Sequence, residues 1–138
     1  MAALAYTRDT RYLNLFQSAL IDPNVTVRFG AVESLLILND PSVKFLVSHA
    51  AREDRSPALR IYAAAGLWRM GDPNGREILL RLYQDADWFT RALATQYLGE
   101  MGGAEDYRKL MLQLGTEQNP QVKAELCSAL LRLQRFKN

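Results

Sequence analysis

The feature that most constrains this chain is a pattern of 31 or 32 residues that occurs four times. In each copy an acidic residue lies six positions before a basic one, a short polar residue lies between them, and a leucine follows. The four columns are Asp22, Asp54, Asp85 and Glu117; Asn24, Ser56, Asp87 and Asn119; Arg28, Arg60, Arg91 and Lys123; and Leu35, Leu67, Leu98 and Leu130. A period of this length predicts a solenoid of stacked units.

Each copy reads as a hairpin of two helices, most clearly in the second helix after Ser56. Ser56 is a good N-cap, and Pro57 suits the first helical position. Apolar residues then recur at helical spacing until Gly71, which can end a helix in a left-handed conformation. Alternation typical of strands is missing, so we predict an all-α chain.

We predict one domain over residues 1–138, a solenoid of four hairpins with units at about 7–38, 39–70, 71–101 and 102–135. The predicted first helices cover 10–21, 42–53, 73–84 and 104–115, and the predicted second helices cover 25–38, 57–70, 88–101 and 120–135. Residues 1–6 resemble the tail of a helix that began upstream, so we expect a fragment of a longer solenoid. Glycines inside the second helices at positions 30, 66 and 99 predict close approach of neighbouring helices.

The pattern resembles the HEAT-like repeats, especially the short type of the phycobilin lyases and bacterial scaffold proteins. The matching segments are Val27-Arg28-(x2)-Ala31-(x3)-Leu35, Leu59-Arg60-(x2)-Ala63-(x3)-Leu67-(x3)-Gly71-Asp72-Pro73 and Thr90-Arg91-(x2)-Ala94-(x3)-Leu98-Gly99-(x2)-Gly102. The resemblance implies a right-handed superhelix whose second helices line the concave side. It implies no single activity, because the fold includes binding proteins, lyase subunits and DNA glycosylases.

The basic column has two interpretations. It could be a ladder for a phosphate backbone, or each side chain could pair with a carboxylate of the acidic column in its own or the next unit. Because every basic residue is matched by an acidic one, we favour structural pairing, for which the planar fork of arginine is well suited. Lys123 would serve this role less well than an arginine.

The second helices carry the candidate binding surface. In the first of them Val27, Ala31, Leu35 and Leu38 are expected to point into the stack, and the opposite side is expected to be concave. A merely solvated face would be charged throughout, whereas this one mixes apolar anchors with a charged rim, as a protein-binding groove does. Our candidate binding residues are Glu33, Ile37, Tyr62, Arg69, Phe89, Leu93, Gln96 and Glu100. Burial between repeats is the alternative role for these side chains.

We therefore expect a non-catalytic scaffold that binds a protein or peptide in the concave groove. The alternatives are a lyase-type or other enzyme subunit that holds a tetrapyrrole or small ligand, and a relative of the HEAT-like DNA glycosylases, which by resemblance use tryptophans with an aspartate. We interpret Trp68 and Trp88 as packing residues, and Asp85 and Asp87 already have turn and capping roles. Nucleic acid is disfavoured because the net charge is only +2 and the stripe lacks a basic track.

Catalytic and metal signals are otherwise missing from the sequence. His49 is the only histidine and falls on a first helix, and Cys127 reads as a small core residue without a histidine partner. We therefore expect no enzyme activity, no metal and no cofactor. With no signal peptide or membrane span in the pattern, we expect a cytoplasmic protein that does not bind membranes.

The two ends of the stack are expected to differ. At the N-terminal end several large side chains lack a complete preceding unit, which predicts cover by upstream sequence, a second copy or a partner subunit. These residues are Leu13, Phe16, Leu20, Phe29 and Leu36. The last helix ends in polar residues, Arg132-Leu133-Gln134-Arg135-Phe136-Lys137, and is expected to close the stack.

Overall fold

A computed structural model describes residues 13–136, and every regular element within that range is a helix. The chain divides into two compact units, Met1–Ile78 and Leu79–Asn138, which are described separately below. The prediction of an all-α repeat protein is confirmed. The predicted single domain, the handedness of the superhelix and its concave side stay predictions.

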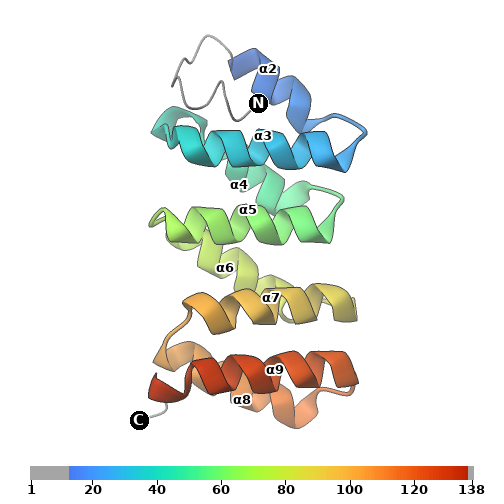
Figure 1. Cartoon of the computed structure of the whole chain (residues 1–138), viewed down its shortest axis with the longest axis vertical. Helices are drawn as coiled ribbons and strands as arrows, with labels where there is room; N and C mark the ends of the chain where they lie inside the picture. The colour runs from blue at the N-terminus through green and yellow to red at the C-terminus, as the bar shows by residue number, and fades with distance from the viewer. Residues whose placement is uncertain (1–12, 137–138) are drawn as a thin grey trace. The chain divides into compact units, whose positions relative to one another are not determined.

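The first unit contains two helical hairpins (Figure 1). The first pairs α2 (Leu13–Leu20) with α3 (Val25–Leu38), and the second pairs α4 (Lys44–Glu53) with α5 (Pro57–Arg69). A short 3-10 turn, η2 (Pro41–Val43), precedes α4, and α6 (Pro73–Leu82) crosses the division between the units. Helix α3 also packs directly on α5, so the two second helices form one layer of this unit.

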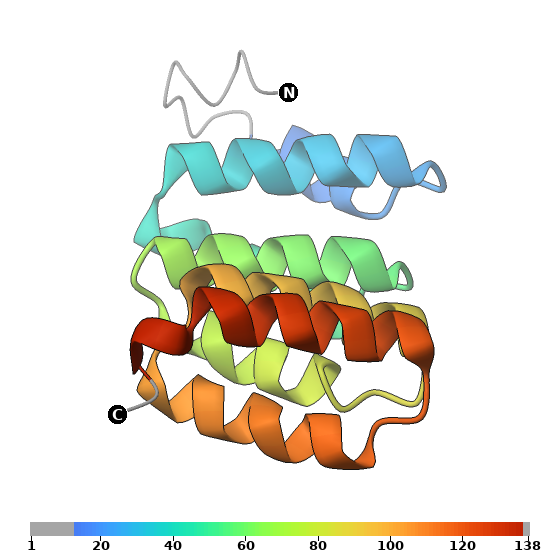
Figure 2. The same cartoon turned by 60° about the horizontal axis from the view of Figure 1, so that its bottom comes forward.

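The second unit repeats this arrangement with α7 (Trp88–Met101), α8 (Ala104–Thr116), α9 (Pro120–Arg132) and the 3-10 turn η3 (Gln134–Phe136). Helices α7 and α9 pack side by side, and α8 packs against α9 in a separate layer (Figure 2). The contact between consecutive second helices is therefore present in each unit independently.

The column of polar residues does cap the second helices, as predicted. Oxygen atoms of these side chains accept hydrogen bonds from backbone N–H groups of the first helical turn. The bonds run from Thr26 N to Asn24 at 2.8 Å, from Leu59 N to Ser56 at 3.3 Å, from Thr90 N to Asp87 at 3.0 Å and from Gln121 N to Asn119 at 2.9 Å. Gly71 adopts the expected left-handed conformation, with φ of 86°. Local capping chemistry thus fixes where each helix begins.

The observed helices agree with the predicted ones to within a few residues. The largest differences are that the 3-10 turn η2 replaces the start of the helix predicted at 42–53, and that α9 ends at Arg132 and gives way to η3. The predicted helix tail at residues 1–6 and the start of the first predicted helix lie outside the described residues.

Four residues of α3 were expected to point into the stack, and all but one of them are buried. Ala31, Leu35 and Leu38 are buried, but Val27 is 38% exposed, so its assignment to the core was wrong. Its counterparts in the later hairpins, Leu59, Thr90 and Val122, are fully buried.

The five large side chains at the N-terminal end differ in burial, and the outside cover predicted for them stays a prediction. Phe16 and Leu36 are buried, whereas Leu13, Leu20 and Phe29 are half-buried. Helix α2 packs on α3, and α3 packs on α5, so these two contacts bury more apolar surface than the sequence pattern indicated.

Two of the three helical glycines lie where neighbouring second helices approach closely. A Cβ atom on Gly66 would collide with the side chain of Leu36, and a Cβ atom on Gly99 would lie 2.7 Å from Cβ and 2.8 Å from Cα of Ala129. The third prediction was wrong, since a Cβ atom on Gly30 would meet nothing within 4 Å. Glycine at positions 66 and 99 therefore permits the packing of consecutive second helices.

We predict that Gly99→Ala destabilises the protein although alanine is the better helix former. The added methyl group would push α9 away from α7, at a cost of about 1–3 kcal/mol that outweighs a gain of about 1 kcal/mol in helix propensity. Gly115→Ala, in the last turn of α8 where a Cβ atom meets nothing within 4 Å, is the matched control and should not destabilise. Urea unfolding of both variants measures the difference, and equal stabilities would contradict the packing argument.

Candidate functional site

Two of the four basic residues, Arg28 and Arg91, bond to the acidic residue of the next hairpin, as the structural interpretation predicted. In the first unit, Arg28 of α3 is buried, and its guanidinium donates from Nε and Nη2 to the carboxylate of Asp54 at 3.0 and 3.3 Å. Its Nη1 donates to the carbonyl oxygens of Asp22 and Pro23 at 2.9 and 3.2 Å. One arginine therefore joins the turn of its own hairpin to the turn of the next.

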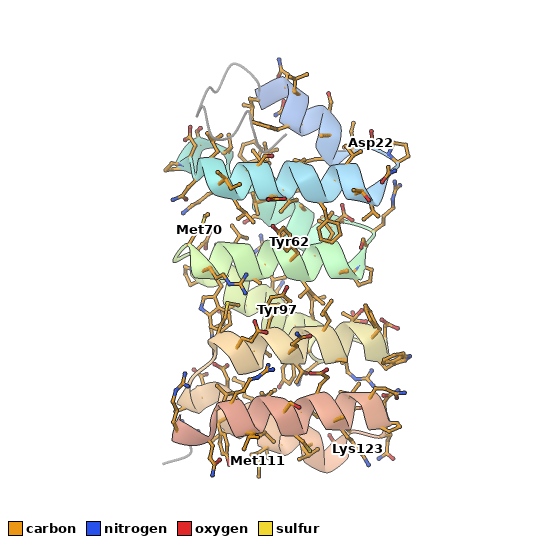
Figure 3. All side chains as sticks on the ribbon, viewed as in Figure 1. Asp22, Tyr62, Met70, Tyr97, Met111 and Lys123 are labelled. Atoms are coloured by element: carbon orange, nitrogen blue, oxygen red, sulfur yellow. The ribbon has the colours of Figure 1, made fainter. Side chains whose placement is uncertain are left out.

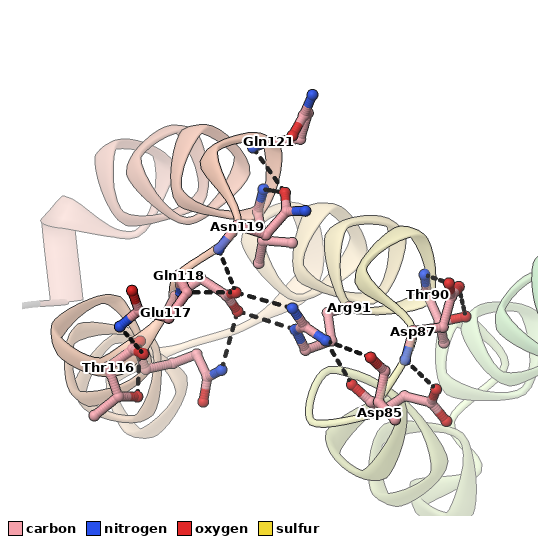
Figure 4. A network of polar contacts seen from close by, with 12 residues as sticks. Asp85, Asp87, Thr90, Arg91, Thr116, Glu117, Gln118, Asn119 and Gln121 are labelled. Atoms are coloured by element: carbon pink, nitrogen blue, oxygen red, sulfur yellow. Dashed lines mark hydrogen bonds and ion pairs between the residues drawn. The ribbon is translucent and has the colours of Figure 1, made fainter.

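The second unit repeats this geometry with a glutamate as the acid (Figure 4). Arg91 donates to the two carboxylate oxygens of Glu117 at 3.0 and 2.9 Å, and its Nη1 donates to the carbonyl oxygens of Asp85 and Ala86, both at 2.9 Å. Glu117 also accepts the backbone N–H of Asn119 at 3.0 Å, and so the same carboxylate holds the turn before α9.

The hydrogen bonds from Arg91 hold the pKa of Glu117 down at about 2, well below its ordinary 4.5, although burial opposes this change. The same contacts raise the pKa of Arg91. The phosphate-ladder interpretation is therefore wrong for Arg28 and Arg91, whose guanidinium groups are engaged within the protein. The pairing expected for Arg60 stays a prediction.

The candidate binding residues of the first unit all have accessible surface. Tyr62 is half-buried and packs against Phe29 of α3, with 5.4 Å between the ring centroids and 57° between the planes (Figure 3). Ile37 is also half-buried, whereas Glu33 and Arg69 are exposed. The alternative of complete burial between repeats does not apply to these four side chains.

In the second unit a shallow groove of about 350 Å³ lies between α7 and α9. It contains three of the candidate binding residues, Phe89, Leu93 and Gln96, of which Phe89 is 49% exposed. The other lining residues are Trp88, Ala92, Gln121, Ala124 and Glu125. The fourth candidate of this unit, Glu100, lies outside the groove and pairs with Arg132 of α9 at 4.0 Å.

Trp88 corrects one of our expectations. It was expected to be a packing residue, but it is 43% exposed, lines the groove and contacts Phe89 edge-on, with 5.9 Å between the ring centroids. Trp88 is the first residue of α7, where little of the chain covers a side chain. Its place directly after the cap Asp87 could have suggested exposure. Trp68 is half-buried.

The sequence did not indicate a second hollow, of about 520 Å³, in the first unit. Its walls come from α2, α4 and the turns beside them, and the paired Arg28 and Asp54 form part of them together with His49. The remaining lining residues are Gln17, Leu20, Ile21, Leu46, Ala50, Glu53 and Arg55. These residues share no sequence motif, which is why the repeat pattern did not reveal them.

Within residues 13–136 no three histidine, cysteine or acidic side chains lie together in a way that could hold a metal ion. His49 and Cys127 are both exposed and lie on helices of different units, so the exposure of Cys127 corrects its assignment to the core. None of the described helices has the length and apolar character needed to cross a bilayer.

Repeated helical hairpins held by the same arginine–carboxylate contact define a helical-repeat protein. A family model described as HEAT repeats matches residues 43–131, which is more than half of the chain. The chain therefore belongs to the HEAT-repeat family. No curated protein and no solved structure shows a significant match to it. HEAT repeats commonly mediate interactions between proteins and typically form non-catalytic scaffolds.

We predict that Glu117→Gln lowers the free energy of unfolding by about 2–3 kcal/mol at pH 7, because it leaves the Arg91 guanidinium without its charged partner. Since folding lowers the pKa of Glu117, its contribution is complete above pH 4.5 and is lost as the pH falls towards 2. The stability difference between wild type and variant should therefore shrink over that range. Urea unfolding at a series of pH values measures it.

The matched control is Glu105→Gln, which removes an exposed carboxylate that lies 3.5 Å from Lys109 one helical turn away. Exposed pairs of this kind contribute about 0.5 kcal/mol or less, so this variant should unfold nearly as the wild type does. A difference between wild type and Glu117→Gln that stays constant from pH 7 to pH 2.5 would contradict the assigned role of Glu117.

Proposed function

We propose that this chain is a non-catalytic scaffold that binds a protein partner along the exposed side of its second helices. The partner would contact Ile37 and Tyr62 in the first unit and Phe89 and Leu93 in the second, with Gln96 and the charged candidate residues Glu33, Arg69 and Glu100 setting its register. Membership of the HEAT-repeat family supports the general role.

The single observation that carries the proposal is the groove between α7 and α9. It is open to solvent, and its aromatic and aliphatic lining is bordered by Gln96, Gln121 and Glu125. Half-exposed Trp88 and Phe89 provide large, rigid contact surfaces of the kind that dominates binding energy at protein interfaces. An apolar side chain of a partner could enter between them while its backbone bonds to the amide groups of the glutamines.

The first unit supports the proposal in a different way. The Tyr62 ring packs against Phe29, yet part of its surface remains accessible. A side chain held in this way loses little conformational freedom when a partner binds, so more of the contact energy is available for affinity. The neighbouring candidate residue Arg69, which is exposed, could pair with an acidic group of the partner.

A protein partner fits the groove better than nucleic acid or an enclosed small ligand. The only charged side chain among the lining residues is Glu125, which would repel a phosphate backbone. A site that holds a small cofactor usually encloses most of its surface, whereas this groove is shallow and open. The family match does not distinguish lyase subunits from other HEAT-repeat proteins.

The test is affinity capture from the source cell extract with the wild type and with Phe89→Ala. We expect that Phe89→Ala loses at least one protein that the wild type captures, with about tenfold weaker binding or more, because a buried aromatic anchor typically contributes 2 kcal/mol or more at an interface. Binding of the identified protein is then measured by calorimetry.

Phe45→Ala is the matched control, since Phe45 is a phenylalanine of α4 that is 60% exposed and lies outside the second helices. It should retain every partner, and both variants should unfold at nearly the wild-type urea concentration. Capture of the same proteins at the same strength by wild type, Phe89→Ala and Tyr62→Ala/Arg69→Glu would overturn the proposal.

A further inference from the structure

Each unit shows which part of a second helix receives the hairpin that follows it. Three residues spaced four apart form a row along one side of the helix. In α3 this row is Arg28, Val32 and Leu36: the arginine bonds to Asp54, the valine is fully buried, and the leucine packs on Gly66 of α5.

The second unit repeats the row two periods later, 63 residues along the chain. In α7 it consists of Arg91, Thr95 and Gly99. Arg91 bonds to Glu117, Thr95 is fully buried, and Gly99 packs against Ala129 of α9. Two units that are compact by themselves therefore use the same three positions to hold the next hairpin.

The equivalent row of α9 is Lys123, Cys127 and Leu131, and all three residues are exposed. Leu131 is 72% exposed. It directly precedes the polar segment that was expected to close the stack, and that expectation stays a prediction. Lys123 makes no ion pair among residues 13–136. Lys123 and Met111 of α8, also exposed, both lie on the side of the unit away from α7 (Figure 3).

The two occupied rows define the chemistry of an occupant for the open one. In both hairpins that are held, an acidic residue lies two positions before the N-cap of the second helix and pairs with the basic residue. A small residue lies twelve positions after that acid and faces the third residue of the row: Gly66 follows Asp54, and Ala129 follows Glu117. Leu131 has the same place in its row as Leu36, which packs on Gly66, so glycine is the small residue that fits best opposite Leu131.

We propose that the outer row of α9 binds a helical hairpin of a partner protein that carries this acid-and-small-residue spacing, with its carboxylate on Lys123 and its small residue on Leu131. This surface is distinct from the groove, and the proposal does not depend on what the groove binds.

A second copy of this chain does not offer a free site with that spacing. The residues twelve positions after Asp22, Asp54, Asp85 and Glu117 are Ser34, Gly66, Tyr97 and Ala129. Asp54 and Glu117 are already paired with Arg28 and Arg91, Ser34 is fully buried, and Tyr97 is not a small residue.

The proposal is tested with a hairpin taken from this chain in place of the partner's hairpin. A second copy of residues 39–71 is joined directly after Leu133, which gives it the same spacing from Leu131 that residues 39–71 have from Leu36. The copy carries its own Asp54 and Gly66. We expect it to cover the open row, so Cys127 should react with a thiol reagent about tenfold more slowly than in the original chain, because a covered thiol must wait for local opening.

Lys123 variants test the ionic part. In the extended chain Lys123→Glu should speed the reaction of Cys127 and Lys123→Arg should slow it, because arginine restores the planar fork of Arg28 and Arg91. In the original chain the same two substitutions should leave the unfolding midpoint nearly unchanged, and they supply the baseline rate, because a charge one helical turn from Cys127 changes the fraction of thiolate. The quantity compared is therefore the ratio of the rates in the extended and original chains for each residue at position 123. This control separates pairing with the added hairpin from any effect within α9.

Three results would overturn the proposal. Cys127 could stay as reactive in the extended chain as in the original, or the Lys123 variants could behave alike in both chains. The original chain could also form dimers in sedimentation, with Cys127 protected as concentration rises, and the occupant would then be a second copy rather than a partner hairpin.

Discussion

The structure depends on one arginine fork repeated between consecutive hairpins. Arg28 and Arg91 each bind two backbone carbonyl oxygens of their own turn and a carboxylate of the next turn. A buried ion pair is expensive to desolvate and often adds little net stability compared with apolar residues. Here the ion pair fixes how consecutive hairpins align. The guanidinium makes all its hydrogen bonds in only one register of the two hairpins, and a slip by one residue would leave it buried without partners.

Second helices pack against two neighbouring helices, and this explains why only a narrow part of their surface is exposed. Helices α3, α5 and α9 each contact their own first helix and one other second helix of the same unit. Small residues such as Gly66 and Gly99 are needed where the backbones of two second helices approach. Only a narrow strip of each helix remains for a partner. In the second unit that strip includes Phe89 and Leu93, and the hollow between α7 and α9 gives it depth. Recognition and stacking therefore use different sides of the same helices.

The sequence predicted most of the local structure, because caps and turns are decided by neighbouring residues. Asn24, Ser56 and Asp87 cap helices where expected, and the arginine–carboxylate pairing followed from the matched columns. Exposure was predicted less well. Val27 and Trp88 have ordinary apolar patterns but lack a covering neighbour, and only the placed helices show this. Only part of the groove could be predicted, because its depth comes from the small residues Ala92 and Ala124. The space that they leave between α7 and α9 is visible only when the two helices are placed side by side.

Glu117 has two structural roles, and together they determine how the second unit unfolds. Glu117 holds the Arg91 fork and also accepts the N–H groups of Gln118 and Asn119 at 3.1 and 3.0 Å just before α9. Separation of α9 from α7 and fraying at the start of α9 therefore break the same set of bonds. In hydrogen-exchange terms these amides should open together with the hairpin contact, which makes the second unit behave cooperatively although its elements touch only their neighbours.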